Sequence, residues 1–220
     1  MKSLIIILFQ LYSIAAMSQP SQKSPIKFLA LGDSYTIGES VKEEERWPEQ
    51  LATALRQKGF TVEKPLIIAK TGWRTDQLQQ AIADANLKPE YNLVSLLIGV
   101  NNQYQGKSTE IYATEFEELL KTAIGLAGGK KENVFVVSIP DYGFTPFGQP
   151  KQAQISKELD AFNAINKKIT QAAGFQYVNI TDISRKGIEQ PDLVADDTLH
   201  PSGAMYKVWA ERILENIKIF

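Results

Sequence analysis

The only histidine of the chain, His200, is the first candidate for chemistry, because imidazole is the side chain best suited to exchange protons near neutral pH. It lies in the segment 196–201, which reads Asp-Asp-Thr-Leu-His-Pro. Asp197 precedes it by three residues, so its carboxylate can reach the Nδ1 side of the ring and leave Nε2 free as a base. Asp196 is the competing partner, and aspartates at this spacing also occur by chance.

A candidate nucleophile stands near the other end of the chain. Ser34 lies in Gly32-Asp33-Ser34-Tyr35, directly after the apolar run 26–31, where a buried strand is expected to end. A serine hydroxyl becomes a useful nucleophile when a neighbouring base accepts its proton. The alternative is that Asp33 or Ser34 only forms a turn or caps a helix.

Two further apolar runs end in a glycine with polar residues nearby. These segments read Thr-Gly-Trp-Arg at 71–74 and Gly-Val-Asn-Asn at 99–102. Glycine lets a backbone N–H approach a ligand closely, and the Asn101 side chain carries an NH₂ donor. Ester hydrolysis builds negative charge on a carbonyl oxygen, and donors aimed at that oxygen lower the barrier. Each glycine can also be a simple strand terminator.

The elements that must position these residues alternate between strand and helix. Val-, Ile- and Leu-rich runs predict strands, and segments with helical periodicity or helix-terminating glycines predict helices. The expected strands are 26–31, 61–69 with a break near Pro65, 93–98, 134–139 and 176–180. The expected helices are 48–58, 75–86, 109–127, 151–173 and a last one from Ser202 or Gly203 nearly to Phe220.

Apolar strands that alternate with helices favour an α/β fold with a parallel sheet covered on both faces. We expect three α/β/α layers around a doubly wound, five-stranded sheet of flavodoxin-like order, in one domain at 26–220. Ligands of such folds bind at the carboxyl ends of the strands. The longest irregular stretches, 139–150 and 181–200, both follow a strand and therefore belong to that side.

Taken together, the blocks resemble the SGNH hydrolases, a branch of the GDSL esterases and lipases. The order agrees: Gly32-Asp33-Ser34, then Gly72, then the block 99–101, then the block 197–201. The blocks cover most of the chain, and it is their combination in this order that is specific. The family usually has leucine after the serine, whereas this chain has Tyr35, a position that carries no catalytic atom.

The resemblance implies carboxylic ester hydrolysis through an acyl-enzyme, without cofactor or metal. It makes Ser34 the nucleophile, His200 the base and Asp197 the residue that orients the base. It places the oxyanion hole at the backbone N–H groups of Ser34 and Gly72 and the side chain of Asn101. Activity is then expected to fall toward acid pH, because only neutral imidazole accepts a proton.

The substrate is less well indicated. Aromatic side chains in loops on the expected active side are candidates for a substrate pocket, although each can also be ordinary packing; they are Trp73, Tyr104, Tyr142 and Phe144. Esters of lipids, sugars and small alcohols all remain open. A thioesterase or acyltransferase on the same site, and a binding module without turnover, are the alternative functions.

Composition and the N-terminal segment narrow the setting. A net charge of -1 and a pI near 6.0 give no reason to expect nucleic acid as a partner. Lys2, the apolar run that follows it and the small residues Ala16 and Ser18 predict a signal peptide at 1–18, too short for a membrane span. We therefore expect a periplasmic or secreted bacterial protein, monomeric, with no membrane span after signal removal.

Overall fold

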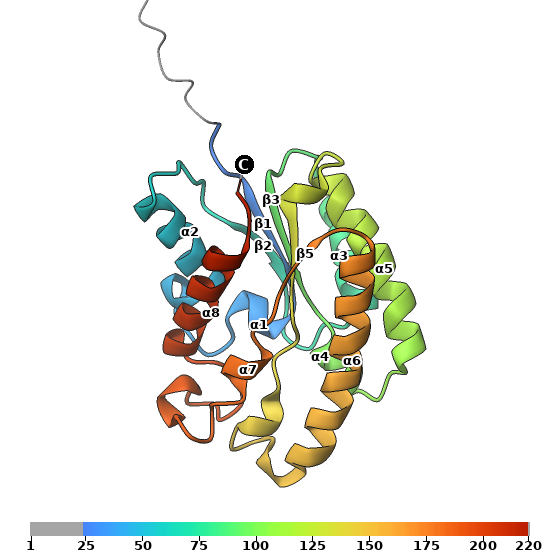
Figure 1. Cartoon of the computed structure of the whole chain (residues 1–220), viewed down its shortest axis with the longest axis vertical. Coiled ribbons are helices and arrows are strands. Elements are labelled where there is room, and N and C mark those ends of the chain that lie inside the picture. Colours follow the sequence, from blue (N-terminus) through green and yellow to red (C-terminus); the bar gives the residue numbers. More distant parts are fainter. Residues whose placement is uncertain (1–23, 220) are drawn as a thin grey trace, which may run out of the picture.

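The computed structural model describes residues 24–219 as a three-layer α/β/α domain (Figure 1). The expected signal peptide at 1–18 lies outside the described residues. Five parallel strands form one sheet in the order β2-β1-β3-β4-β5. The strands are β1 (Phe28–Gly32), β2 (Leu66–Ala69), β3 (Leu93–Leu97), β4 (Val134–Val137) and β5 (Gln176–Val178). This is the doubly wound, flavodoxin-like arrangement expected from the sequence.

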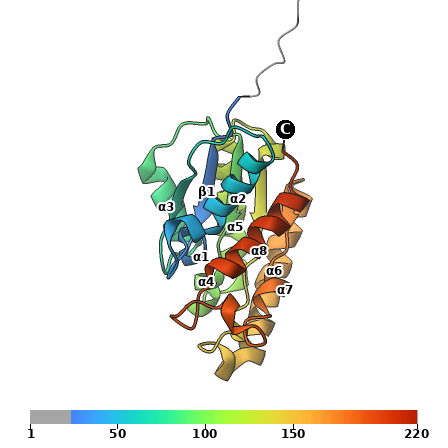
Figure 2. The ribbon, with the colours of Figure 1, turned by 90° about the vertical axis from the view of Figure 1, so that its left-hand side faces the viewer.

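Helices cover both faces of the sheet. Figures 1 and 2 show α2 and α8 together on one face and α3, α5 and α6 on the other. The α-helices are α1 (Ser34–Ile37), α2 (Trp47–Gln57), α3 (Thr75–Ala85), α4 (Val100–Tyr104), α5 (Thr109–Leu126), α6 (Gln152–Ala172), α7 (Thr181–Ser184) and α8 (Gly203–Asn216). Short 3₁₀ turns occur at Glu43–Glu45, Lys131–Asn133, Tyr142–Phe144, Gln149–Lys151 and Pro191–Leu193.

The central strands explain why the fold is stable. Every residue of β1, β3 and β4 is buried, as expected for parallel strands with helices on both faces. The helices α2 and α8 share one face of the sheet, and the tryptophans that they carry, Trp47 and Trp209, are both fully buried. Burial of a large apolar side chain contributes about 1.5–3 kcal/mol, so the core supplies the main stabilisation.

The second predicted strand pairs along only part of its length, and the last predicted helix ends about where the sequence placed it. The run 61–69 is broken, as expected near Pro65: only Leu66–Ala69 pairs along β1, while Val62 makes an isolated bridge to Ile26. The last helix ends at Asn216, close to Phe220 as predicted. Ile217 is extended and buried. The Lys218 N–H donates to the Gln176 side chain of β5, which holds the chain away from the helix axis.

The sheet order creates a crevice where β1 and β3 lie side by side, because the chain continues from their carboxyl ends to opposite faces. Close approach at this edge requires glycine. A Cβ on Gly32 would lie 2.5 Å from the carbonyl oxygen of Leu97 and 2.1 Å from Oγ1 of Thr36. The helices α1 and α4 begin here, so the segments 32–34 and 99–101 lie together at the carboxyl edge of the sheet.

Candidate active site

Ser34 is the first residue of α1 and follows β1 after a single intervening residue. That residue, Asp33, caps the helix: its Oδ1 accepts a hydrogen bond from the Tyr35 N–H at 3.1 Å. Gly38 ends the four-residue helix in the left-handed conformation, with φ of 71°. Ser34 is buried and lines a cavity. The end of β1, the Asp33 cap and the short helix α1 together fix its position.

Asp33 itself is fully buried, and its Oδ2 has no hydrogen-bond partner among the described residues. Burial raises the pKa of this carboxyl from 3.8 to about 7, and its backbone hydrogen bonds oppose that shift only in part. A carboxyl that is costly to ionise therefore stands directly beside Ser34.

His200 and Asp197 meet as the spacing predicts. The imidazole Nδ1 lies 2.6 Å from Asp197 Oδ2, whereas no such contact involves Asp196. The loop 195–200 folds back on itself at this pair: the Ala195 N–H donates to the His200 carbonyl, and Thr198 adopts a positive φ of 65°. His200 is buried and faces the cavity that Ser34 also lines.

The Asp197 carboxylate accepts several hydrogen bonds. Oδ1 accepts from the backbone N–H groups of Leu199 and His200, both at 2.9 Å, and Oδ2 also accepts from Ser40 Oγ at 2.6 Å. Burial raises the pKa of this group, but the hydrogen bonds from Ser40, His200 and the backbone together outweigh burial and lower it from 3.8 to about 2. Because an ionised carboxylate only accepts, Nδ1 of His200 must be the donor, which leaves Nε2 of the neutral ring as an acceptor.

Gly72 and Asn101 lie on the same cavity from two adjacent segments. The Asn101 Nδ2 donates to the Trp73 carbonyl at 3.1 Å, which orients the amide and ties α4 to the loop 71–74. Asn102 is fully buried and strengthens this tie: its Nδ2 donates to Thr75 Oγ1 at 2.6 Å and its Oδ1 accepts from the Thr75 N–H at 3.1 Å. The segment that presents Gly72 is therefore anchored on α4.

These segments enclose a cavity of about 330 Å³, which we call the Ser34 cavity. Its lining residues are Ser34, Tyr35, Thr71, Gly72, Val100, Asn101, Tyr104, Tyr142, Phe147, Leu199 and His200. The structure thus gathers the predicted nucleophile, base and donors around one space, with Asp197 behind the base. Volume and lining both fall within the usual range of small-molecule sites.

Two of the four predicted substrate residues do not line this cavity. Tyr104 and Tyr142 do, but the half-buried Trp73 packs against the core and contributes only its carbonyl to the Asn101 amide. Phe144 lies under the guanidinium of Arg185, whose carbon is 5.9 Å from the ring centroid. Phe147, from the same aromatic loop, lines the cavity instead.

Three residues of this region were not predicted from the sequence as site residues. Ser40 contacts Asp197 from a distant segment, and Asn102 anchors the loop of Gly72. The ring of Tyr35, at the position usually occupied by leucine, packs on the His200 imidazole with centroids 5.3 Å apart. No local signal distinguishes Ser40, whereas the doubled asparagine after Gly99 was a visible signal for Asn102.

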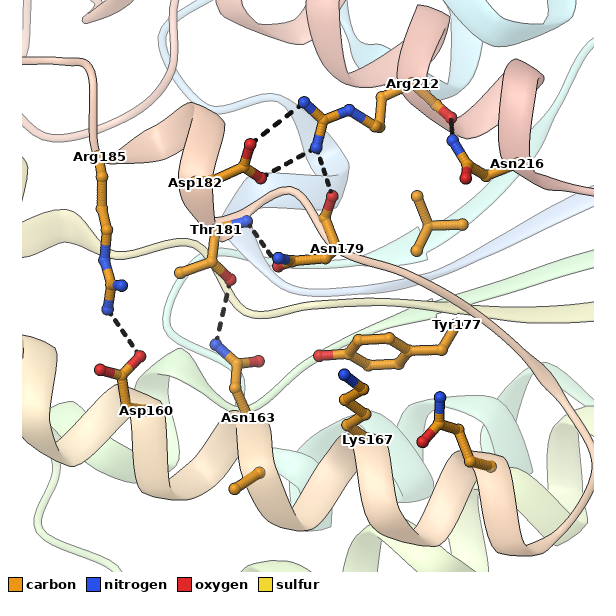
Figure 3. Close-up of a pocket in the computed structure, with 13 residues that line it drawn as sticks. Asp160, Asn163, Lys167, Tyr177, Asn179, Thr181, Asp182, Arg185, Arg212 and Asn216 are labelled. Carbon is orange, nitrogen blue, oxygen red and sulfur yellow. Dashed lines mark hydrogen bonds and ion pairs between the residues drawn. The ribbon is translucent and has the colours of Figure 1, made fainter.

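A larger cavity, of about 500 Å³, opens between α6 and α8 beside β5 (Figure 3). Its charged groups largely pair with one another: Arg212 binds Asp182 at 2.9 Å, and Arg185 binds Asp160 at 2.6 Å. It holds no serine or histidine, so the predicted nucleophile and base both lie outside it, at the Ser34 cavity.

Residues 24–219 show neither a metal-binding cluster nor a membrane-spanning helix. Within this range no three His, Cys, Asp or Glu side chains are grouped so as to hold a metal ion. Nor does any helix in it have the length and apolar character to cross a bilayer.

Several solved structures share this fold. They include the lipase Lip_vut3 from a goat rumen metagenome, with a TM-score of 0.71 and 16% identity over 89% of this chain and 100% of that chain. The acetylxylan esterase Axe2 from Geobacillus stearothermophilus has a TM-score of 0.69 and 17% identity over 90% and 96% of the two chains. The psychrotrophic esterase EstA from Pseudoalteromonas sp. has a TM-score of 0.65 and 15% identity over 86% and 95%.

A search among curated proteins found no match. The family comparison is more specific than the fold, because residues 30–208 match the GDSL-like lipase/acylhydrolase family. The match begins in β1, before Ser34, and ends within α8, beyond His200, so it includes every block on which the resemblance rested. The chain therefore belongs to the GDSL-like lipase/acylhydrolase family and is a carboxylic ester hydrolase with the SGNH hydrolase fold.

Proposed function

We propose that the protein cleaves carboxylic esters through a Ser34-His200-Asp197 triad and an acyl-enzyme. One observation carries the proposal: Ser34 and His200, from opposite ends of the chain, line the same cavity while Nδ1 of His200 lies 2.6 Å from Asp197. This arrangement supports the transfer of a proton from the Ser34 hydroxyl to Nε2.

In the first half-reaction the Ser34 oxygen attacks the acyl carbonyl, and His200 takes the hydroxyl proton. The negative charge that forms on the carbonyl oxygen is stabilised by the N–H groups of Ser34 and Gly72 and by Asn101. The Asn101 amide nitrogen has two hydrogens; the Trp73 carbonyl takes one, and the other serves the oxyanion. Each such donor contributes about 3–4 kcal/mol to lowering the barrier.

The first half-reaction ends when the ester C–O bond breaks and His200 gives its proton to the departing alcohol, which leaves the acyl group on Ser34. In the second half-reaction water enters the Ser34 cavity. The neutral imidazole takes a proton from that water as its oxygen attacks the acyl-enzyme carbonyl. The Ser34–acyl bond breaks, and the proton returns to the serine oxygen. Throughout, the Asp197 carboxylate accepts the Nδ1 hydrogen bond and stabilises the imidazolium.

The decisive experiment is the Ser34→Ala variant. It is expected to fold but to lose nearly all hydrolysis of p-nitrophenyl acetate and all labelling by a fluorophosphonate probe. Ser156→Ala is a matched control, because Ser156 lies on α6 and its hydroxyl has no hydrogen-bond partner in the described structure. Turnover of Ser34→Ala at the wild-type rate would exclude serine catalysis, and a wild-type protein without Ser34-dependent turnover would favour a binding module.

The same chemistry acts on thioesters and can pass the acyl group to an alcohol instead of water. A panel of p-nitrophenyl esters and acyl-thioesters, assayed with and without a polyol acceptor, separates these reactions. Faster release from esters than from thioesters, with free acid as the product, is the expected result.

We also propose that residues 1–18 act as a signal peptide and that the single domain at 26–220 works as a monomer in the periplasm or outside the cell. The positive start and short apolar run support export. Mass spectrometry of the protein recovered from a bacterial host should show the N-terminus after Ser18. Recovery of the uncleaved chain only from the membrane fraction would contradict export of a soluble domain.

A further inference from the structure

Another cavity, of about 420 Å³, adjoins the Ser34 cavity; we call it the second cavity, and it is distinct from the larger one between α6 and α8. Three aromatic side chains, Tyr104, Tyr142 and Phe147, line both spaces, and we call them the aromatic wall. Their ring centroids lie 6.1–6.4 Å from one another. Because the two cavities share these rings, a ligand that reaches Ser34 can extend along the wall into the second cavity.

Two rings of the aromatic wall are exposed and the third, Tyr142, is buried, and hydrogen bonds hold Tyr142 and the Phe147 backbone. Tyr104 and Phe147 are 60% and 47% exposed, and large exposed rings beside a cavity mark a surface for ligands. The Phe147 N–H donates to the Thr198 carbonyl at 3.1 Å, in the loop of the catalytic histidine. The Tyr142 hydroxyl donates to Gln103 Oε1 at 3.0 Å. The wall is therefore positioned relative to the proposed triad.

The far side of the second cavity is polar. Glu158 Oε2 accepts from Gln103 Nε2 at 2.6 Å, and its Oε1 accepts from Gln154 Nε2 at 2.9 Å. These two hydrogen bonds lower the pKa of Glu158, so the carboxylate is ionised at neutral pH. All three side chains line the cavity and retain donor or acceptor positions that a ligand can use.

This combination discriminates between two kinds of occupant. A fatty acyl chain in the second cavity would cover an ionised carboxylate and two amides without offering a hydrogen bond, which is costly. A sugar ring has hydroxyl groups for those side chains and C–H faces that pack against aromatic rings. The chemistry of the second cavity therefore favours a polyhydroxylated group over an alkyl chain.

We infer that the substrate is a short-chain ester of an oligosaccharide, with the acyl group at Ser34 and the sugar chain running along the aromatic wall into the second cavity. The inference rests on the proposed function, because it assigns the leaving alcohol of that reaction. Glu158, Gln103 and Gln154 then bind sugar hydroxyls, and the aromatic wall sets the direction of the chain.

The test compares acetate release from partially acetylated xylotetraose and from acetylated xylose. The wild-type kcat/KM is expected to be at least tenfold higher for the tetrasaccharide, because only the longer chain reaches the second cavity. Gln154→Trp fills that cavity and should bring the ratio of the two values to within twofold of one. Ala153→Trp is the matched control, since Ala153 is an exposed neighbour on α6 that does not line the cavity, and it should keep the wild-type ratio.

The outcomes are distinguishable. A wild-type ratio near one, with p-nitrophenyl acetate still hydrolysed, overturns the sugar site and leaves the proposed function standing. A preference for p-nitrophenyl decanoate over the acetate that Gln154→Trp abolishes would make the second cavity an acyl site and also overturn the inference. Absence of Ser34-dependent hydrolysis of p-nitrophenyl acetate removes the proposed function, and the inference with it.

Discussion

Asp197 is held by more contacts than its partnership with the histidine requires. The oxygen that accepts from His200 Nδ1 also accepts from Ser40 Oγ, and both distances are 2.6 Å. Ser40 has a positive φ of 66°, an unfavourable conformation for a residue other than glycine. A costly backbone conformation that directs a hydroxyl at the Asp197 carboxylate makes Ser40 a positioning residue for the proposed triad.

Removal of the Ser40 hydroxyl should therefore affect catalysis rather than folding. Without this donor the pKa of Asp197 rises from about 2 toward its ordinary value, and the carboxylate is a stronger acceptor for the imidazolium. The acid limb of kcat/KM should then move to higher pH in Ser40→Ala. The value of kcat/KM at neutral pH should then fall, by up to about fivefold for a shift worth about 1 kcal/mol, because the acid limb extends closer to neutral pH.

Ser40→Gly separates the hydroxyl from the backbone. Glycine adopts a positive φ without strain, whereas alanine does not, so the two variants share only the loss of the hydroxyl. Equal shifts of the acid limb in both variants support the positioning role. A pH profile that stays in the wild-type position in both, whatever their stability, contradicts it.

Among single residues, the sequence was sufficient to select those that can be recognised from their own segment of the chain. Ser34, Asp197 and His200 could be selected because a nucleophile, an acid and the only imidazole each stand at the end of an apolar run or before a helix. Ser40 could not be selected, because its partner is more than 150 residues away and nothing in its own segment records that contact. Phe144 and Phe147 could not be separated either, since the contact of Phe144 with Arg185 and the place of Phe147 at the cavity are tertiary features.

Among the elements, α4 has a role out of proportion to its five residues. It presents Asn101 to the Ser34 cavity, and through Asn102 it holds Thr75 at the end of the loop that carries Gly72. Gly99 precedes it with φ of 132°, where a Cβ would lie 2.7 Å from side-chain atoms of neighbouring elements. The oxyanion donors proposed from two segments therefore depend on one short helix.

Asn102→Ala tests this dependence. The variant loses both hydrogen bonds to Thr75, so the loop of Gly72 is held to α4 less firmly, chiefly by the bond from Asn101 to the Trp73 carbonyl. We expect about 1–3 kcal/mol lower stability from the unpaired buried groups. We also expect kcat for p-nitrophenyl acetate to fall about tenfold or more, because a displaced donor stabilises the oxyanion poorly.

Gln79→Ala is the matched control for Asn102→Ala. It removes a hydrogen bond between α3 and Thr122 of α5, away from the loop of Gly72, and should lower stability without a comparable loss in kcat. Urea unfolding and steady-state kinetics on both variants provide the comparison. A normal kcat in Asn102→Ala would show that the loop keeps its position without this tie.

The long elements were predictable because their apolar periodicity extends over many residues. All five strands and the five longer helices appear where the sequence placed them, with shifts at their ends. The short helices α1, α4 and α7 were not predicted, since four or five residues contain too little periodicity to register. Of the three, only α1 has a side-chain N-cap, from Asp33, and all three begin just after strands whose ends pack in the tertiary structure.

For the whole molecule, the buried carboxyl of Asp33 couples stability to pH. Its pKa is near 3.8 in the unfolded chain and about 7 in the fold, so the fold favours the neutral acid. The stability that this group contributes is fully present below about pH 4 and is lost as the pH rises through about 7. A difference of about three pKa units corresponds to about 4 kcal/mol.

Asp33→Asn should remove this dependence, because the amide keeps an oxygen for the Tyr35 N–H but does not ionise. The free energy of unfolding of the variant relative to wild type should increase by about 4 kcal/mol between pH 4 and pH 8. Urea unfolding at both values measures that relative change, in which the other titrating groups cancel. A difference between variant and wild type that is the same at both pH values would contradict it.

The placement of Ser34 in the first described helix and His200 just before the last one has a consequence for biosynthesis. A ribosome releases Ser34 well before His200 and α8, because 166 residues separate the two side chains along the sequence (200 − 34). A nascent chain therefore carries the proposed nucleophile without its proposed base until the segment of His200 has emerged.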